Sequence, residues 1–170
     1  MEQMRSDAQW KSISPYELEN ACKLIGKDWM LVCAGDNAMT ASWGGMGILW
    51  NKPVSFVFIR PQRYTYQMTE ANDRLTLAFF DESYRDALRY FGTKSGRDGD
   101  KFAATGLTRA YTESGTLYPA EARLVLTCRK LYTDMLRKEA FLDPALLSNY
   151  PADDFHRMYV CEIEEAWIKA

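Results

Sequence analysis

The stretch V-S-F-V-F-I-R-P, residues 54–61, carries the clearest strand pattern in this 170-residue chain. Apolar residues occupy almost every position, so a strand over residues 54–60 is expected to be buried on both faces. Successive side chains alternate between the faces, with Val54, Phe56 and Phe58 on one and Ser55, Val57 and Ile59 on the other. Pro61 ends the strand because proline has no N–H to donate to a neighbouring strand.

Further strands are predicted on both sides of this one. Apolar runs or alternating patterns cover residues 29–34, 39–43, 75–80, 124–132 and 157–167. The total is about six or seven strands, most of them short and separated by turn residues. The two longest patterns close the chain, and we expect them to form long strands.

Helical signals are few and short. Residues 84–91 carry apolar side chains at helical spacing, with Ser83 and Asp86 as a capping box and Gly92 as the C-terminal glycine. A second short helix is expected from residue 98 or 99 to residue 104. Because long helices do not alternate with the strands, the pattern argues against a doubly wound parallel sheet. The pattern predicts a mainly β fold with short helices, an antiparallel barrel with helical insertions.

Length and charge limit the classes of function. We expect one domain over residues 1–170, with residues 1–12 as a flexible or extended N-terminus. The net charge of −2 gives no case for binding nucleic acid or an anionic membrane. No apolar run reaches the ~20 residues needed to span a bilayer, and the polar start lacks the apolar core of a signal peptide. A cytoplasmic location is therefore expected.

The cysteines do not form a metal-binding pattern. They are far apart, no C-x-x-C occurs, and the chain has one histidine, His156. A zinc site is improbable on these grounds. We expect buried reduced thiols at Cys22, Cys33, Cys128 and Cys161.

The first candidate binding segment is N-A-M-T-A-S-W-G-G-M-G, residues 37–47. Strand alternation places Thr40 and Ser42 on one side. Glycines bring the backbone close to a ligand, and the amide of Asn37 and the ring of Trp43 suit a planar heterocycle. The alternative for the glycines is a kinked corner of the barrel.

The second candidate segment is R-P-Q-R-Y-T, residues 60–65, which follows a strand and precedes a predicted helical turn through Thr69. The guanidinium groups of Arg60 and Arg63 match phosphate oxygens, and free N–H groups at a helix start add donors. The alternative is that both arginines are ordinary surface cations.

The third candidate segment is S-G-R-D-G-D-K-F, residues 95–102. Ser95 offers a hydroxyl and Lys101 a cation one turn into the short helix. The carboxylates of Asp98 and Asp100 are expected to cap this helix and to pair with Arg97 or Lys101. Taken alone, this segment also fits a solvated loop.

Together the three segments fit flavin mononucleotide (FMN), which has a phosphate at one end and a flat ring at the other. In this order they resemble the flavin reductase-like family with the FMN-binding split barrel, and the flavoredoxin group in particular. The resemblance covers residue 23 to the end and rests on residues 37–53, 56–66, 77–85, 95–107 and 155–163.

The resemblance implies a homodimer with non-covalent FMN near the interface. It assigns Asn37, Thr40, Ser42 and Trp43 to the ring or ribityl chain, and Arg60, Arg63, Thr65, Ser95 and Lys101 to the phosphate. Arg97 either joins the phosphate group or braces its loop. His156 would approach the ring, from its own or the partner subunit, as a candidate for proton supply or for polarising the ring. An aromatic cover seen in some relatives is expected to be missing or replaced, with Trp167 as one candidate.

The implied reaction passes electrons from NAD(P)H or a protein donor through FMN to a small-molecule or protein acceptor. No G-x-G-x-x-G follows a strand, so a nicotinamide would have to stack on the exposed face of the flavin. The alternative is an electron carrier or flavin-binding module without NAD(P)H turnover of its own. A third possibility, a split barrel with an empty or repurposed site, is less consistent with the three polar segments.

Overall fold

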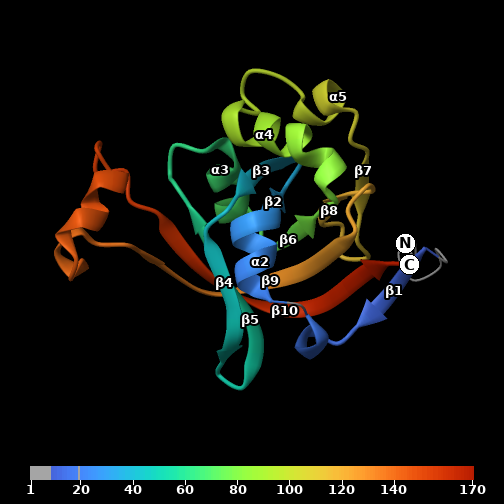
Figure 1. Ribbon diagram of the computed structural model, residues 1–170, viewed down its shortest axis with the longest axis horizontal. Helices are drawn as coiled ribbons and strands as arrows, with labels where there is room; N and C mark the ends of the chain where they lie inside the picture. The colour runs from blue at the N-terminus through green and yellow to red at the C-terminus, as the bar shows by residue number, and fades with distance from the viewer. Residues whose placement is uncertain (1–8, 19) are drawn as a thin grey trace.

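The computed structural model describes residues 9–18 and 20–170, and its centre is one antiparallel sheet (Figure 1). The strands of the chain are β1 (Trp10–Ile13), β2 (Met30–Ala34), β3 (Asn37–Ala41), β4 (Gly44–Leu49), β5 (Lys52–Ile59), β6 (Arg74–Phe79), β7 (Arg109–Tyr111), β8 (Leu117–Pro119), β9 (Leu124–Met135) and β10 (Arg157–Lys169). β7 and β8 form a separate two-stranded sheet.

Short helices connect or cover the strands. They are η1 (Pro15–Glu17), α2 (Ala21–Lys23), η2 (Leu24–Asp28), α3 (Tyr64–Ala71), η3 (Glu82–Tyr84), α4 (Arg85–Thr93), α5 (Lys101–Thr105), η4 (Lys138–Ala140) and η5 (Pro144–Asn149). None of those described is long and apolar enough to cross a bilayer. The predicted mainly β, antiparallel architecture with short helices is confirmed.

The main sheet has eight strands in the order β3-β2-β6-β9-β10-β5-β4, with β1 added beside β10. The long strands β9 and β10 lie at its centre and pair along most of their length. The edge strands β3 and β4 follow each other in the chain, joined only by Ser42 and Trp43. Three Cα–Cα steps span at most roughly 11 Å, so the sheet must curl until its two edges approach.

The described residues form no ladder between β3 and β4, so the sheet is not closed into a barrel. The predicted barrel is therefore wrong as a closed structure. The physical reason is at the junction, where Gly44 has φ 155° and a Cβ would lie 2.8 Å from the carbonyl oxygen of Phe56. Here β4 turns to pair with β5, which leaves the edge of β3 unpaired.

Two apolar clusters lie on the two faces of the sheet. Alternation along β2 shows this directly, because Met30, Val32 and Ala34 enter one cluster while Leu31 and Cys33 enter the other. The second cluster is covered by α4 and α5, which contribute its two fully packed phenylalanines, Phe91 and Phe102. The packing of Phe91 and Phe102 in this second cluster holds α4 and α5 against that face of the sheet.

Several local predictions need correction. The strand predicted over residues 39–43 runs instead from Asn37 to Ala41. The capping box of Ser83 and Asp86 does not form, because an additional turn, η3, precedes α4, and Tyr84 is the N-cap of α4 without a side-chain hydrogen bond. Gly92 lies inside the last turn of α4 and not beyond it. Residues 1–8 of the expected N-terminal segment lie outside the described residues, and β1 pairs with β10.

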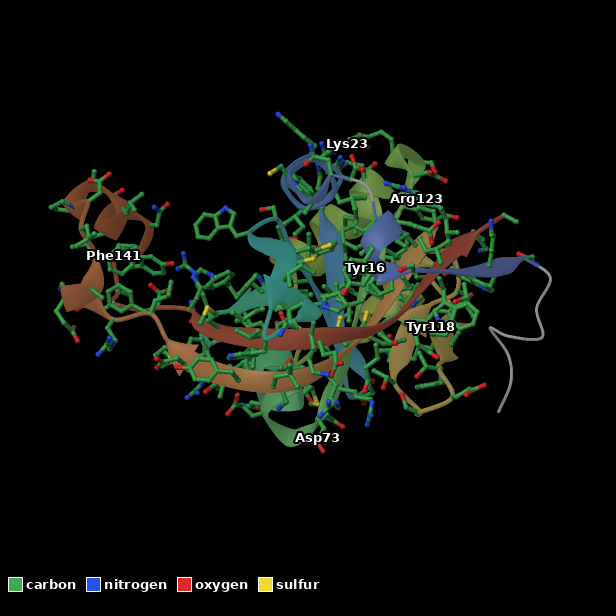
Figure 2. The ribbon with its side chains drawn as sticks, turned by 90° about the horizontal axis from the view of Figure 1, so that it is seen from below. Tyr16, Lys23, Asp73, Tyr118, Arg123 and Phe141 are labelled. Atoms are coloured by element: carbon green, nitrogen blue, oxygen red, sulfur yellow. The ribbon has the colours of Figure 1, made fainter. Side chains whose placement is uncertain are left out.

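An arm formed by residues 136–156 projects from the body of the protein. It links β9 to β10 and contains η4 and η5 (Figure 1). Figure 2 shows Phe141 on this arm, well away from the rest of the sheet. The base of the arm, at His156, returns to the open edge of the sheet. This return brings residues far apart in sequence into one site.

Candidate functional site

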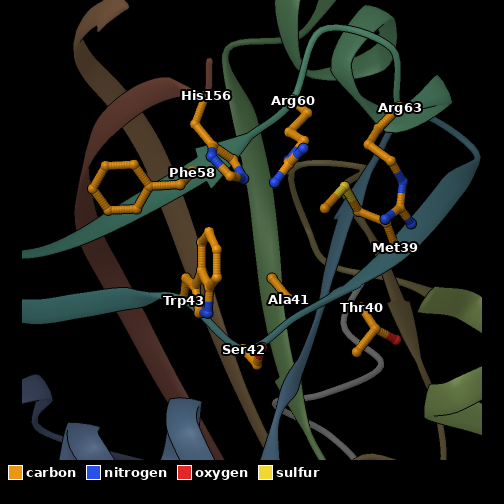
Figure 3. Close-up of a pocket in the computed structure, with 9 residues that line it drawn as sticks. All are labelled: Met39, Thr40, Ala41, Ser42, Trp43, Phe58, Arg60, Arg63 and His156. Atoms are coloured by element: carbon orange, nitrogen blue, oxygen red, sulfur yellow. The ribbon is translucent and has the colours of Figure 1, made fainter. Parts of the chain in front are cut away.

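A cavity of about 190 Å³ lies at the open edge of the sheet (Figure 3). The link between β3 and β4, the end of β5 and the start of β10 surround it. Its aromatic side is formed by Trp43, Phe58 and His156, and its cationic side by Arg60 and Arg63. The cavity thus has one flat apolar end and one positively charged end.

The aromatic side leaves one large ring accessible. The Trp43 side chain is 49% exposed, and its ring centroid lies 5.4 Å from that of His156. The Phe58 ring meets His156 edge-on at 6.4 Å. An exposed indole beside a buried imidazole offers a flat surface on which a planar ligand can pack.

His156 is buried, and one ring nitrogen is engaged by the protein. Its Nδ1 lies 2.8 Å from the hydroxyl oxygen of Tyr150. Burial and, secondarily, the nearby Arg60 lower the pKa of His156 to about 4. The imidazole is therefore neutral near pH 7. It can donate or accept a hydrogen bond, but it does not hold an extra proton ready for transfer.

Arg60 is tied to the arm. One guanidinium nitrogen contacts Oδ2 of Asp154 at 2.5 Å, and the other donates to the carbonyl of Asn149 at 2.8 Å. The hydrogen bond from Arg60 holds the pKa of Asp154 below its usual range. The guanidinium also lies over the ring of Tyr150. Arg60 lines the cavity, but its charge is already compensated.

Arg63 and Lys101 are different, because neither has a carboxylate partner among the described residues. Both donate to the carbonyl oxygen of Phe91, at 3.2 Å and 3.4 Å, and Lys101 also donates to the carbonyl of Ala38 at 2.5 Å. Burial and the charge of Arg63 lower the pKa of Lys101 to about 8. Burial and the charge of Arg60 lower the pKa of Arg63. Two uncompensated cations, one buried and one partly buried, that meet at the same carbonyl oxygen favour an anion.

A second cavity, of about 250 Å³, adjoins Lys101 but not Arg63. It is lined by Asp36, Asn37, Tyr64, Gly96, Gly99, Asp100, Lys101 and Arg109. The side-chain amide of Asn37 donates to the buried hydroxyl of Thr65 at 2.9 Å. Gly96 is required here, because a Cβ would lie 2.4 Å from Oδ1 of Asn37. The second and third sequence segments therefore meet beside β3, as one binding site would require.

The remaining predicted residues lie at the margins. The hydroxyl of Thr40 donates to the carbonyl of Leu88 on α4. Ser42 is exposed on the link and lines the cavity. The hydroxyl of Ser95 accepts from the N–H of Arg97. The Arg97 side chain donates to the carbonyl of Gln62 and lies over the ring of Tyr64, so in this structure it braces the loop.

Two side-chain roles predicted for this region are wrong. Trp167 is buried in the second apolar cluster, far along β10 from His156, and cannot cover the cavity. Asp100 caps α5 as expected, but its ion pair is with Arg109 at 2.8 Å and not with Arg97 or Lys101. The charge of Lys101 is left uncompensated for this reason.

The cysteines are free in the structure, and three of them are buried as expected. Cys22 is exposed, which corrects the prediction for that residue because it lies on a surface helix. Across the described residues, no group of three or more histidine, cysteine or acidic side chains could hold a metal ion.

Sequence reasoning missed Phe58, Tyr150 and Asp154 as parts of the site. The segment Y-P-A-D-D-F-H, residues 150–156, contains a usable signal. It places two aromatic residues and two carboxylates directly before the only histidine, just ahead of a long strand. No local pattern, however, indicates that Asp154 would face Arg60.

Comparisons with known proteins agree with this geometry. The family described as "Flavin reductase like domain" matches residues 25–170, and the chain belongs to this family. Comparison with curated protein sequences gave no significant match.

Solved structures with the same fold include three informative examples. Flavoredoxin of Desulfovibrio vulgaris (Miyazaki F) is 22% identical with a TM-score of 0.65, over 83% of this chain and 69% of that one. An FMN-binding domain of a flavin reductase-like enzyme from Shewanella baltica is 16% identical with a TM-score of 0.68, over 94% and 77%. A NADH:FAD oxidoreductase of Streptomyces globisporus is 16% identical with a TM-score of 0.61, over 84% and 81%.

Proposed function

We propose that this chain binds FMN without a covalent bond and works as an oxidoreductase of the flavin reductase type. The observation that carries the proposal is the pair Arg63 and Lys101. Arg63 is partly buried and Lys101 is buried, and neither has a carboxylate partner in the described structure. Arg63 lines the cavity with the accessible aromatic wall, and Lys101 reaches the same carbonyl oxygen of Phe91 from behind it. A dianionic phosphate would compensate both charges.

The proposed orientation follows from the two ends of the site. The flavin ring packs on the side of Trp43, Phe58 and His156, and the phosphate lies toward Arg63 and Lys101. In this arrangement the edges of β3 and β4, which do not pair with each other, leave the opening of a split barrel. The cofactor enters through this opening. Flavoredoxin and an FMN-binding domain of a flavin reductase-like enzyme share this fold, which supports the binding of FMN.

FMN held by these residues would supply reversible transfer of electrons. The side chains bind and orient it. Because His156 is neutral near pH 7, its proposed role is to polarise the ring through a hydrogen bond, and not to supply a proton as an imidazolium. NAD(P)H or a protein donor would approach the face of the flavin ring that points away from Trp43.

The first experiment is the visible absorption spectrum of the purified protein, with identification of any flavin released by heating. A flavin spectrum and released FMN are expected. A colourless protein that also fails to take up added FMN would refute the proposal. The described fold would then hold an empty or repurposed site.

The competing function is an electron carrier or flavin-binding module that a partner protein reduces. The similarity to flavoredoxin favours this alternative, and the similarity to a NADH:FAD oxidoreductase favours the enzyme. Steady-state oxidation of NADH and NADPH with a flavin acceptor separates the two. Turnover supports the enzyme, whereas slow stoichiometric reduction supports the carrier.

We also propose a homodimer with the flavin near the interface. The half-exposed Trp43 at the site and the projecting arm, where Leu142 is 100% exposed, support this proposal. Light scattering coupled to size-exclusion chromatography tests it, and a flavin-loaded monomer would contradict it. The cytoplasmic location stays a prediction.

A further inference from the structure

We propose that Tyr150 is a positioning residue, which fixes the neutral imidazole of His156 with Nδ1 as acceptor and with its remaining proton on Nε2, available to a ligand in the cavity. The inference deepens the proposed flavin site and rests on that function for its ligand. Its first test, however, needs no flavin.

The direction of the hydrogen bond follows from counting protons. The Tyr150 hydroxyl has one proton, and a neutral imidazole has one N–H and one bare nitrogen. If Nδ1–H donated to the phenol oxygen, the phenol proton would have no acceptor among the described residues, in a side chain that is only 7% exposed. A phenol proton without an acceptor is costly when buried. The hydroxyl therefore donates to Nδ1.

Once Nδ1 accepts, the remaining imidazole proton must be on Nε2. This nitrogen has no hydrogen-bond partner in the part of the chain that the structure describes, and His156 lines the cavity. Figure 3 shows the imidazole between Phe58 and Arg60, above Trp43. Nε2–H is thus a free donor for an acceptor atom on a ligand packed against Trp43.

Tyr150 is held firmly enough to act in this way. Its ring lies 4.8 Å from that of Phe155 and 5.8 Å from that of Phe141, and it meets His156 edge-on at 5.5 Å. Arg60 lies over the Tyr150 ring at 5.1 Å while it binds Asp154. The arm therefore fixes the position of the hydroxyl relative to Nδ1.

Other charged groups near His156 do not oppose this assignment. Among the described residues, Arg60 is the cation that disfavours a second imidazole proton, and Asp154 is the carboxylate that acts in the opposite direction. Burial raises the pKa of Tyr150, so its hydroxyl keeps its proton near pH 7. Both effects preserve a neutral imidazole with an O–H donor beside it.

The primary test is nitrogen-15 NMR of the imidazole in flavin-free protein. His156 is the only histidine, so histidine-specific labelling gives one assignable ring. We expect a single tautomer with protonated Nε2 and bare Nδ1. A spectrum with protonated Nδ1, or an averaged mixture, would overturn the proposal, and this result does not depend on whether any variant folds.

The variant Tyr150→Phe keeps the ring and removes the donor. We expect its imidazole to become a mixture of tautomers and its FMN affinity to fall by about twofold to tenfold, the range for one neutral hydrogen bond. The matched control is Tyr132→Phe, since Tyr132 is exposed and its hydroxyl contacts Asp134. An unchanged tautomer in Tyr150→Phe would count against the inference. If neither wild type nor variant bound FMN, the flavin function would fail while the tautomer result stood.

Discussion

Replacing Lys101 by methionine should weaken FMN binding strongly while changing the stability of the empty protein little. Lys101 is 4% exposed, and its pKa falls from 10.5 to about 8. This corresponds to roughly 3 kcal/mol of unfavourable free energy for the charged form in the folded protein. Methionine removes that cost but also removes the donor to the carbonyl of Ala38, at about 1–3 kcal/mol, while the carbonyl of Phe91 still accepts from Arg63. The two contributions are of similar size and opposite sign.

For FMN affinity, in contrast, Lys101→Met brings no favourable contribution that would offset the loss. Losing one charge-assisted contact to a phosphate costs about 1.5–3 kcal/mol, which is about tenfold to 150-fold in affinity. Titration calorimetry with FMN measures this loss, and thermal unfolding of the flavin-free protein measures stability. A dissociation constant within about twofold of wild type would refute the assignment of Lys101 to the phosphate. Lys11→Met, at an exposed lysine on β1, is the matched control and should change neither quantity.

The same lysine predicts a pH dependence. A bound phosphate raises the pKa of Lys101 above its value of about 8 in the empty protein, so binding takes up protons near and above that pH. FMN affinity should therefore fall as pH rises beyond about 8. Lys101→Arg, whose charge persists, should remove this dependence. Calorimetry in two buffers of different ionisation enthalpy measures the proton uptake, and its absence in wild type would contradict the mechanism.

Three further results are expected. Trp43→Ala should weaken FMN binding and leave the melting temperature nearly unchanged, because Trp43 is half-exposed, and flavin fluorescence titration measures this. Gly44→Ala should destabilise the fold by about 2 kcal/mol or more in chemical denaturation, because its Cβ would lie 2.8 Å from the Phe56 carbonyl oxygen, whereas Gly47→Ala has open space. The pKa of His156 is lower in the folded than in the unfolded protein, so the unfolded state binds more protons between pH 6.5 and about 4. Wild-type stability should therefore fall as pH drops through that window, and less so in His156→Gln.

The sequence predicted much of the fold because strand formation leaves a local record. Alternation along residues 54–60 indicated burial on both faces. The face of Ser55, Val57 and Ile59 is buried in β5, whereas on the other face Phe56 and Phe58 are only partly buried and Phe58 lines the cavity. The boundary of β3 was misplaced because Ser42 and Trp43 continue the alternating pattern. The turn at Gly44, which depends on the approach of Phe56 from β5, ends the strand earlier.

The candidate site was predicted as three segments, and the structure brings parts of all three together. Arg63 and Lys101 meet at the carbonyl of Phe91, and Asn37 reaches Thr65. The sequence could not show which of the cations binds the phosphate, because a cation is available to a ligand only when no carboxylate compensates its charge. Arg60 has Asp154 as its partner, at a sequence separation of 94, which no local pattern reveals.

By itself, the sequence determined six of the ten described strands and the residue types that can hold a phosphate and a flat ring. It did not indicate β1, β4, β7 or β8. The features that it determined depend on side-chain periodicity and on the chemistry of single residues, which are local properties of the chain. Only the tertiary structure decided that the sheet stays open between β3 and β4 and that Trp167 is buried in the core. It also decided that the arm places Tyr150 against His156, because desolvation and hydrogen-bond direction depend on neighbours that chain folding brings together.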